Sequence, residues 1–475
     1  MVADRWDDYG VESRFELFYY ESKNDSTYIG AIKIINSSTE RTNIQKYKVR
    51  NFMDDKFYYL AENDFCSLGQ SQSYYDNIKS IFPQKYMSIL WALKDCAIFS
   101  FIEDNFERHR FFSSLIRDNS VERLLRQEKY IIEGRKISSC ENFSYEFHPK
   151  YSDSPINIEF SFDIHNIFAQ RVFAIIGQNG VGKTQLITSL PIDLANQKEA
   201  SFAPQVPLYS KIIAVSNSLY DSFDIPKSRL GFNYVYCGLS KGRKEKKTIL
   251  DPKELKLQLT DAARIINGRE RAESLKNILK PLYQDTIIQK IFTSQKNKVH
   301  IDIQSLVEII DYISSGESSL LFIFFNIVKN IRYDSLLLFG EPEIHLYPNA
   351  ITSLMSSIYQ LLDDYQSYAI LVTHSPLVIR EMRSCGVRVM ERNDDFPTVR
   401  YINMESLGAN ISSLVEDIFE NKDIPKYYKI KIEQLIKPGK SYEEMISALQ
   451  PDDLELGIGI KMYIKQLYES VNEEN

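Results

Sequence analysis

Residues 171–184 read Arg171-Val-Phe-Ala-Ile-Ile-Gly-Gln-Asn-Gly-Val-Gly-Lys-Thr184, and this stretch decides the fold. An apolar run typical of a buried strand is followed by a complete G-x-x-x-x-G-K-T pattern. Glycines let backbone N–H groups surround phosphate oxygens, and a helix that starts directly after Gly182 points the positive end of its dipole at them. The stretch therefore predicts a strand, a phosphate-binding loop and a helix in succession, as in a nucleoside triphosphate site.

The loop supplies the first set of candidate cofactor-binding residues, which are Gly177, Gln178, Asn179, Gly180, Val181, Gly182, Lys183 and Thr184. We expect Lys183 to neutralise the β- and γ-phosphates and the Thr184 hydroxyl to ligate Mg²⁺. ATP and Mg²⁺ are thus the predicted cofactors, with Thr184 as the predicted metal ligand.

Two later apolar runs end in polar side chains. Ser335–Phe339 is followed by Gly340 and Glu341, and the run that starts at Ser367 ends in Thr373 and His374. An acid at the carboxyl end of a parallel strand beside a phosphate loop lies where a water-activating base is needed. Glu341 is therefore the candidate general base, and His374 is a candidate contact to the γ-phosphate.

A fourth motif, Ile313-Ser-Ser-Gly-Glu-Ser-Ser319, opens the apolar helix expected over Leu320–Val328. Ser314 or Ser315 together with Gly316 at a helix start makes a second N-terminus able to bind anions. Ser315, Gly316 and Glu317 are therefore candidate nucleotide contacts. The alternative is that the turn is only a helix cap.

Taken in order, the four motifs resemble the ABC-type ATPase cassette. Two of the motifs, Glu341-Pro-Glu-Ile-His-Leu-Tyr-Pro348 and Thr373-His-Ser-Pro376, resemble those of the AAA-family branch that includes the RecF, SMC and OLD proteins. Within that branch the chain most resembles the PtuA ATPase subunit of Septu-type anti-phage systems. The ATPases of retrons and of the PARIS system share many of the same sequence motifs. The further stretches that carry this resemblance are Lys211–Ser216, Thr373–Ile379, Glu405–Ile411 and Val415–Phe419.

Alternating strands and helices around a phosphate loop predict an α/β core with a mostly parallel sheet. The resemblance, which covers about Ile158–Glu420, implies an ABC-type cassette with a mixed, mostly parallel sheet, an inserted helical subdomain and a helical C-terminal tail. The expected regions are an N-terminal α+β region (1–165), a phosphate-loop lobe (166–240), a helical insertion with the signature motif (241–334), the second half of the cassette (335–420) and a helical tail (421–475).

The resemblance also implies partners. Ser315 and Gly316 would contact the γ-phosphate held by a second protomer, so that ATP joins two chains head to tail in a dimer or a larger homo-oligomer. A separate nuclease subunit, of the HNH type by resemblance, would be under the control of the ATPase. Asn217 or Ser218 would take the part of the cassette's glutamine loop. The first 165 residues and the tail after Asn421 carry no site of their own, so we expect them either to contact such partners or simply to pack against the cassette.

Gly340 is a departure from the family, which normally has Asp directly before the catalytic Glu. That carboxylate helps to hold the shell of Mg²⁺, and its loss leaves the metal to Thr184 and the phosphates, with help from Glu343. Nucleotide binding should survive, whereas hydrolysis is expected to be slow.

Composition narrows the class of protein. The 475 residues carry a net charge of −7, five scattered cysteines and no apolar run of the ~18 residues that span a bilayer. The acidic start, Met-Val-Ala-Asp-Arg-Trp-Asp-Asp, does not fit a secretory signal. We expect a cytoplasmic protein without a membrane segment.

Three alternatives remain beside the defence subunit, and one of them is a toxin-regulating ATPase of the retron or PARIS type. The basic cluster Lys241–Lys247 keeps open a DNA contact and a RecF- or SMC-like repair ATPase, which would bind DNA directly. An ATPase with its own OLD-type nuclease is disfavoured, because the adjacent Asp452 and Asp453 point to different faces of any helix or strand.

Outside the four motifs, periodicity predicts the remaining elements. Arg14–Tyr20 and Tyr28–Ile35 fit strands, and a helical pattern runs from Tyr74 to about Glu133. Strands near Phe143–His148 and Ile158–Asp163 lead into the phosphate loop. Charged helices are expected between about Pro252 and Thr293, and Ser441 with Glu444 predicts a capping box in the tail.

Overall fold

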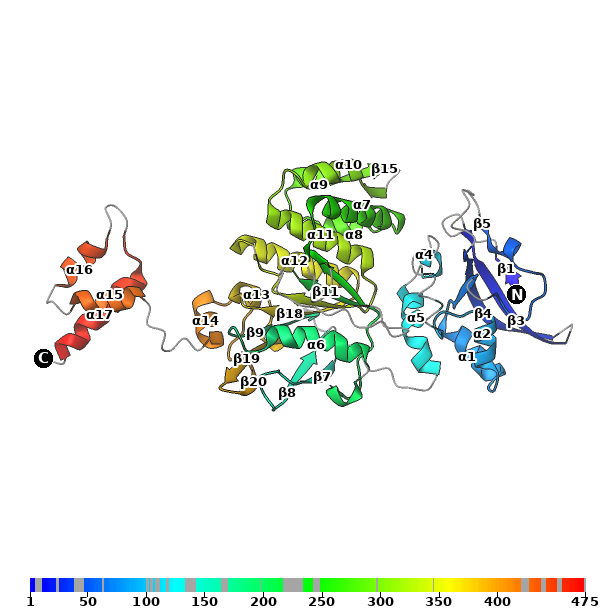
Figure 1. Ribbon diagram of the computed structural model, residues 1–475, viewed down its shortest axis with the longest axis horizontal. Helices are drawn as coiled ribbons and strands as arrows, with labels where there is room; N and C mark the ends of the chain where they lie inside the picture. The colour runs from blue at the N-terminus through cyan, green and yellow to red at the C-terminus, as the bar shows by residue number, and fades with distance from the viewer. Residues whose placement is uncertain are drawn as a thin grey trace. The chain divides into compact units, whose positions relative to one another are not determined.

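The chain divides into two compact units, Met1–Leu414 and Val415–Asn475. Their elements are drawn in Figure 1. The computed structural model describes residues 1–4, 11–22, 25–37, 47–61, 64–99, 102, 106, 112–116, 119–132, 142–163, 170–196, 198–216, 234–241, 248–295, 298–344, 346–419, 427–436, 441–450 and 455–473.

A seven-stranded sheet forms the centre of the first unit. Its strand order is β12-β11-β17-β18-β9-β19-β20, and all neighbours are parallel except β19 and β20. The four strands β11, β17, β18 and β9 are buried along their whole length, as expected when both faces of a parallel sheet are covered. The predicted α/β class with a mixed, mostly parallel sheet is confirmed. The strands are β9 (Val172–Ile176), β11 (Ile212–Ser216), β12 (Tyr234–Gly238), β17 (Leu336–Gly340), β18 (Tyr368–Thr373), β19 (Val387–Asn393) and β20 (Phe396–Tyr401).

Helices cover both faces of this sheet. Figure 1 shows α6 on one side, together with β7 (Asn142–Phe147) and β8 (Ile156–Ser161), and α11 and α12 on the other. Helix α11 is buried from Leu320 to Val328, so it is apolar all round rather than amphipathic. The helices are α6 (Lys183–Ala195), α11 (Ser315–Asn330), α12 (Pro348–Asp364) and α13 (Pro376–Arg380).

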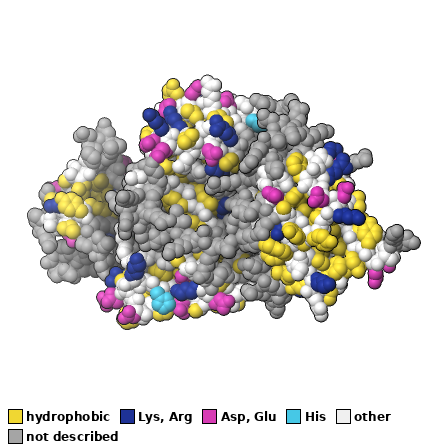
Figure 2. Space-filling view, turned by 45° about the vertical axis from the view of Figure 1, so that its right-hand side comes forward, with side chains coloured by type: hydrophobic (Ala, Val, Ile, Leu, Met, Phe, Trp, Pro, Cys, Tyr) yellow, Lys and Arg dark blue, Asp and Glu magenta, His cyan; other side chains and the backbone are white. Residues whose placement is uncertain are grey.

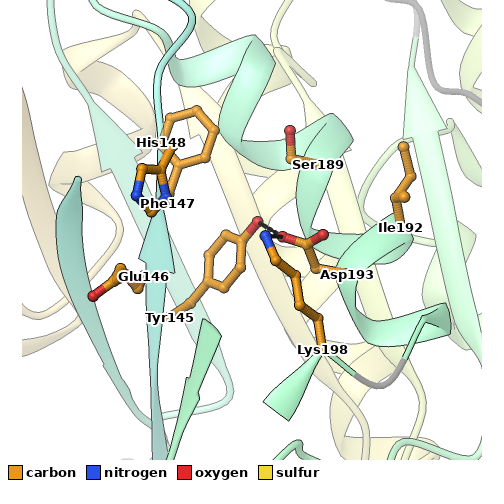
Figure 3. A pocket seen from close by; sticks show the side chains of 8 residues that line it. All are labelled: Tyr145, Glu146, Phe147, His148, Ser189, Ile192, Asp193 and Lys198. Atoms are coloured by element: carbon orange, nitrogen blue, oxygen red, sulfur yellow. Dashed lines mark hydrogen bonds and ion pairs between the residues drawn. The ribbon is translucent and has the colours of Figure 1, made fainter. Parts of the chain in front are cut away.

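A small antiparallel sheet packs against α6. It has the order β10-β7-β8, from Phe202–Ala203, Asn142–Phe147 and Ile156–Ser161. A cavity of about 210 Å³ lies between β7 and α6 (Figure 3). In it the buried Tyr145 hydroxyl donates to Oδ2 of Asp193 over 2.8 Å, and Nζ of Lys198 lies 3.6 Å from the same oxygen. Because its charges pair with each other, this network ties the helix after the phosphate loop to the small sheet.

The stretch from Pro252 to Ile291 is largely helical, as predicted. Helix α7 opens with a capping box of Asp251 and Glu254, and the helices continue to Ile291. A hairpin of β15 and β16, which the periodicity did not indicate, follows. The elements are α7 (Pro252–Gly268), α8 (Ala272–Leu279), α9 (Asp285–Ile291), β15 (Phe292–Gln295), β16 (Lys298–Ile301) and α10 (Ile303–Ile309), with the short pair β13 (Ser240–Lys241) and β14 (Thr248–Ile249) before them.

The N-terminal region has a hydrophobic core of its own. Its four-stranded sheet has the order β1-β3-β4-β6, and β3 and β4 confirm the two predicted strands. On the sheet surface Tyr20 and Tyr28 are 58% and 49% exposed, and Figure 2 shows hydrophobic side chains gathered on this region. The elements are β1 (Val2–Ala3), β3 (Arg14–Ser22), β4 (Asp25–Asn36), β6 (Phe65–Gly69), α1 (Gln72–Ile81), α2 (Tyr86–Ala92), α4 (Phe112–Leu115) and α5 (Asn119–Ile132), beside the pair β2 (Val11–Glu12) and β5 (Tyr47–Lys48).

The second unit is a small helical cluster around the buried side chains of Ile432, Met445 and Ile464. The predicted capping box of Ser441 and Glu444 is confirmed at the start of α16. Among the described residues of the whole chain, no helix has the length and apolar character needed to cross a membrane. The helices are α14 (Ile411–Phe419), which begins in the first unit, α15 (Tyr427–Ile436), α16 (Tyr442–Leu449) and α17 (Ile458–Glu473).

Candidate functional site

The carboxyl ends of the parallel strands bring the predicted site residues to one edge of the sheet. Gly340 of β17 is in register with Val372 of β18, and Thr373 is in register with Ile176 of β9. The residues that follow these strands therefore lie side by side. The structure gathers the phosphate loop, Glu341 and His374 at this edge, as the sequence predicted.

The loop has the backbone conformation that its glycines permit. Gly180 and Gly182 have φ values of +83° and +100°, in the left-handed region that residues with a Cβ rarely adopt. Gly182 is also the N-cap of α6. Gly177 is required for a steric reason, because a Cβ there would lie 2.0 Å from the backbone oxygen of Met390 in β19. The loop thus needs two glycines for its turns and one for close approach of a strand.

Lys183 points its amine into the loop. The side chain is 4% exposed, and Nζ donates to the backbone oxygens of Gly177 and Gln178 over 2.9 and 2.8 Å. Nζ also lies 3.3 Å from Nδ1 of His374. Burial lowers the pKa of Lys183 to about 8, against the opposing attraction of Glu341 and Glu343. A phosphate in the loop would offer this amine a stronger, charge-assisted partner than the carbonyls do.

Glu341 and His374 form the next contact of the series. Nε2 of His374 lies 3.3 Å from Oε1 of Glu341. Burial lowers the pKa of His374, and the charge of Lys183 adds to the effect. Glu341 has a φ of +46°, a conformation that costs about 1–3 kcal/mol for a residue other than glycine. Its backbone N–H donates to the oxygen of Val372 over 2.8 Å, which holds the strained residue against β18.

Glu343 is more central than the sequence suggested. Its Oε1 accepts hydrogen bonds from Oγ1 of Thr373 over 2.6 Å and from the backbone N–H of His374 over 2.9 Å. Its Oε2 is buried and has no hydrogen-bond partner among the described residues. Glu343 therefore fixes the start of the loop after β18 and leaves one carboxylate oxygen unsatisfied.

Tyr151 and Arg392 also adjoin the phosphate loop. The Tyr151 hydroxyl donates to the backbone oxygen of Val181 over 2.8 Å, and the Arg392 guanidinium lies 4.1 Å from the centre of the Tyr151 ring. Sequence reasoning missed this pair, because the two residues are far apart in the chain and neither belongs to a motif. No local pattern could have joined them.

The turn before α11 is a complete helix cap. Ser314, not Ser315, is the N-cap: its Oγ accepts from the Glu317 N–H over 3.3 Å, and Oε2 of Glu317 accepts from the Ser314 N–H over 2.9 Å. The Tyr283 hydroxyl donates to the Glu317 backbone oxygen over 2.6 Å. None of the hydrogen bonds that 314–317 make in the described part of the chain reaches the phosphate loop. Within one chain the turn is capped, with Ser315 exposed and Gly316 partly exposed.

The remaining predicted site residues are the metal ligand, the candidates for the glutamine loop and the basic cluster. Thr184 is half-buried in the first turn of α6, and its role as a metal ligand stays a prediction. No group of three or more His, Cys, Asp and Glu side chains among the described residues is arranged to hold a metal. Asn217, Ser218 and the part of the basic cluster from Gly242 to Lys247 lie outside the described residues.

Comparison with protein families decides the class of this domain. Residues 191–380 match the family described as "AAA domain, putative AbiEii toxin, Type IV TA system". These residues are therefore similar to an AAA domain. The match begins within α6, just after the phosphate loop, and includes the turn before α11 and the ends of β17 and β18. The prediction of an AAA- or ABC-type ATPase is confirmed. The assignment to a Septu-type system stays a proposal.

Relatives of the whole chain are distant. Protein ea59 of Escherichia phage lambda is 24% identical over 484 residues, covering 94% of this chain and 90% of that protein. Among solved structures, the SMC head domain from Thermotoga maritima is 13% identical with a TM-score of 0.28, covering 56% of this chain and 100% of that one. The ABC transporter component cbiO1 from Clostridium perfringens is 15% identical with a TM-score of 0.28, covering 49% and 78%.

Proposed function

We propose that the chain is an ATP-binding subunit of an anti-phage defence complex, which assembles on ATP and controls a separate nuclease. The series Lys183–His374–Glu341 carries the nucleotide part of this proposal. These side chains follow three different strands, and each adjoining pair is 3.3 Å apart. A cation, an imidazole and a carboxylate around a phosphate loop are the groups that binding and hydrolysis of a terminal phosphate require.

The residues of the loop fit a nucleotide and its metal. The left-handed glycines and the start of α6 would offer backbone N–H groups to the phosphates, and the Lys183 amine, now bonded to two carbonyls, would bind phosphate oxygens instead. Mg²⁺, when bound, screens the phosphate charge, and Thr184 and the acids at the strand ends would hold it. His374 lies beside Lys183 and would contact the terminal phosphate. Glu341 would accept the proton of the attacking water.

The same geometry supports a slow enzyme. Gly340 has no side-chain oxygen at the end of β17, so one of the usual groups around the metal is missing there. A protein that holds ATP well and hydrolyses it slowly is suited to gating rather than to motor work. In this proposal the exposed Ser315 and the partly exposed Gly316 complete the site of a second protomer. Neither residue is needed by the capping contacts of its own chain.

The defence role rests on the comparisons with known proteins. The matching family is named for an AbiEii toxin and a type IV toxin–antitoxin system, and the distant relative is a phage protein. The N-terminal region, with its exposed aromatic surface, and the tail are the proposed contacts for the nuclease, and the complex would act in the cytoplasm. The family description also favours a second candidate, a toxin-regulating ATPase of the retron or PARIS type.

Calorimetry with ATP tests the nucleotide site. Lys183→Ala should lose at least about 100-fold in affinity, because a charge-assisted contact worth roughly 3 kcal/mol disappears from a desolvated loop. Lys183→Arg is the matched control that keeps the charge. Unchanged binding by the alanine variant would refute the site.

Co-expression with the neighbouring genes tests the complex. Recovery of a nuclease on the ATPase supports the defence subunit, whereas recovery of a toxin without nuclease motifs supports the second candidate. If the ATPase alone instead binds duplex DNA tightly, with a steep dependence on salt, the direct DNA-binding alternative is favoured.

A further inference from the structure

We propose that Glu343 supplies the carboxylate that holds the divalent cation at this site, with Oε1 fixed by the loop after β18 and Oε2 turned to the ion. The inference rests on the proposed nucleotide site and deepens it. The candidate ion is a hard cation with oxygen ligands, such as Mg²⁺ or Mn²⁺.

The orientation of Glu343 is the first support. Two hydrogen bonds, from the Thr373 hydroxyl and the His374 N–H, meet on Oε1. Two donors from adjacent residues fix the plane of a carboxylate, as the outer contacts of metal ligands do. The acid is thus held in place before any ion arrives.

The unsatisfied oxygen is the second support. Oε2 of Glu343 is buried without a hydrogen-bond partner among the described residues. Burying a charged oxygen without a partner costs free energy. A bound cation would satisfy it. The position is suitable, since Oε1 of Glu343 accepts from the N–H of His374, and Nδ1 of His374 lies 3.3 Å from the Lys183 amine. The carboxylate therefore lies at the phosphate end of the site.

The neighbouring acid is less suited to this role. Oε1 of Glu341 lies 3.3 Å from His374, and its backbone is held in a strained turn. Gly340, the residue before it, offers no side chain. A metal at this edge therefore has Glu343 as its best oriented carboxylate, three residues beyond Gly340.

Binding of Mn²⁺, followed by electron paramagnetic resonance with and without ADP, tests the inference without relying on turnover. Glu343→Gln keeps an acceptor for Thr373 and His374 but removes the charge, and we expect at least about tenfold weaker Mn²⁺ binding. Affinity for ADP in the absence of metal should be unchanged. The control Glu405→Gln removes an exposed acid elsewhere, and its Mn²⁺ affinity should match that of the unaltered chain.

A second variant guards against a folding defect. Adding Gly340→Asp to Glu343→Gln should restore Mn²⁺ binding to within a few-fold, which a misfolded protein would not do. The inference is overturned if Glu343→Gln binds Mn²⁺ like the unaltered chain, or if its only defect is weaker ADP binding without metal. The latter result would make Glu343 a positioning residue alone. Mn²⁺ binding that depends on Glu343 in a chain that binds no ADP would overturn the proposed nucleotide site and leave this inference standing.

Discussion

The turn that opens α11 and the turn that follows β17 each contain a glutamate, but they satisfy their polar groups differently. At the first turn, Ser314 and Glu317 bond to each other in a closed cap. At the second, Glu341 is strained and Glu343 keeps a buried oxygen without a partner. A satisfied turn contributes stability whether or not a ligand is present. Strain and an unsatisfied buried oxygen are tolerated where a ligand compensates for them, which indicates that the second turn serves the site.

The largest effect is expected from Glu341→Gln, which removes the candidate base at the strained turn. ATP turnover should fall by roughly 100-fold or more, since general base catalysis contributes about that much, while ATP affinity changes little. Steady-state phosphate release and calorimetry measure the two quantities. Glu405→Gln, an acid away from the edge, is the control. Equal turnover in both variants would remove Glu341 from the mechanism.

Gly316→Arg tests whether the capped turn also acts on a second chain. A long cationic side chain in a packed interface costs about 1–3 kcal/mol, so ATP-dependent assembly should weaken by roughly five- to 150-fold with ATP binding intact. Light scattering with a slowly hydrolysed ATP analogue reports the assembly. Gly268→Arg is a matched control on α7, where no atom lies within 4 Å of an added Cβ. Undisturbed assembly of the Gly316 variant would leave the turn with capping as its only role.

The charge of Lys183 gives the site a dependence on pH. Its pKa is about 8 before nucleotide binds, and the phosphates favour the protonated amine. Below pH 8 the amine is already charged, so affinity for ADP should be nearly flat. Above pH 8 each unit removes about tenfold of the charged form, and affinity should fall by up to that factor. Calorimetry between pH 7.5 and 9.5 shows the slope, and Lys183→Arg should lack it. A flat profile for the unaltered chain would contradict the role of this amine.

The smallest effect is expected at the satisfied turn. Ser314→Ala removes the side chain that caps α11 and should lower the free energy of unfolding by about 0.5–2 kcal/mol. Urea unfolding measures this loss, and ATP affinity should stay the same. Weakened ATP binding without a change in stability would reverse the contrast between the two turns.

The sequence predicted which residues lie at the site edge of the sheet better than it predicted the contacts that those residues make with each other. Gly177–Thr184 and the apolar strands before Glu341 and His374 are local patterns, so their type and position were readable. Parallel pairing then requires their ends to meet, which the register of Gly340 with Val372 confirms. The capping box at Ser441 is equally local, and it was found for the same reason.

What was missed depends on contacts between distant parts of the chain. The Thr373–Glu343 hydrogen bond joins the end of β18 to the turn after β17, 30 residues apart. The Arg392–Tyr151 contact joins residues on opposite sides of the phosphate loop in the sequence. Neither pair leaves a spacing pattern. Ser314 rather than Ser315 is the N-cap because the helical backbone begins at Ser315. Two adjacent serines do not reveal in the sequence which of them precedes the first helical residue.

The close approach of β19 to Gly177 has a consequence for genetics. Any other residue there would place its Cβ 2.0 Å from the Met390 backbone oxygen, so the strand would have to move. An allele with a substitution at Gly177 should therefore lower the amount of protein in the cell and behave as a recessive null. A Lys183→Ala allele leaves the backbone in place, so its product should accumulate and enter mixed complexes with normal chains. If assembly needs every nucleotide site, only the second allele will be dominant.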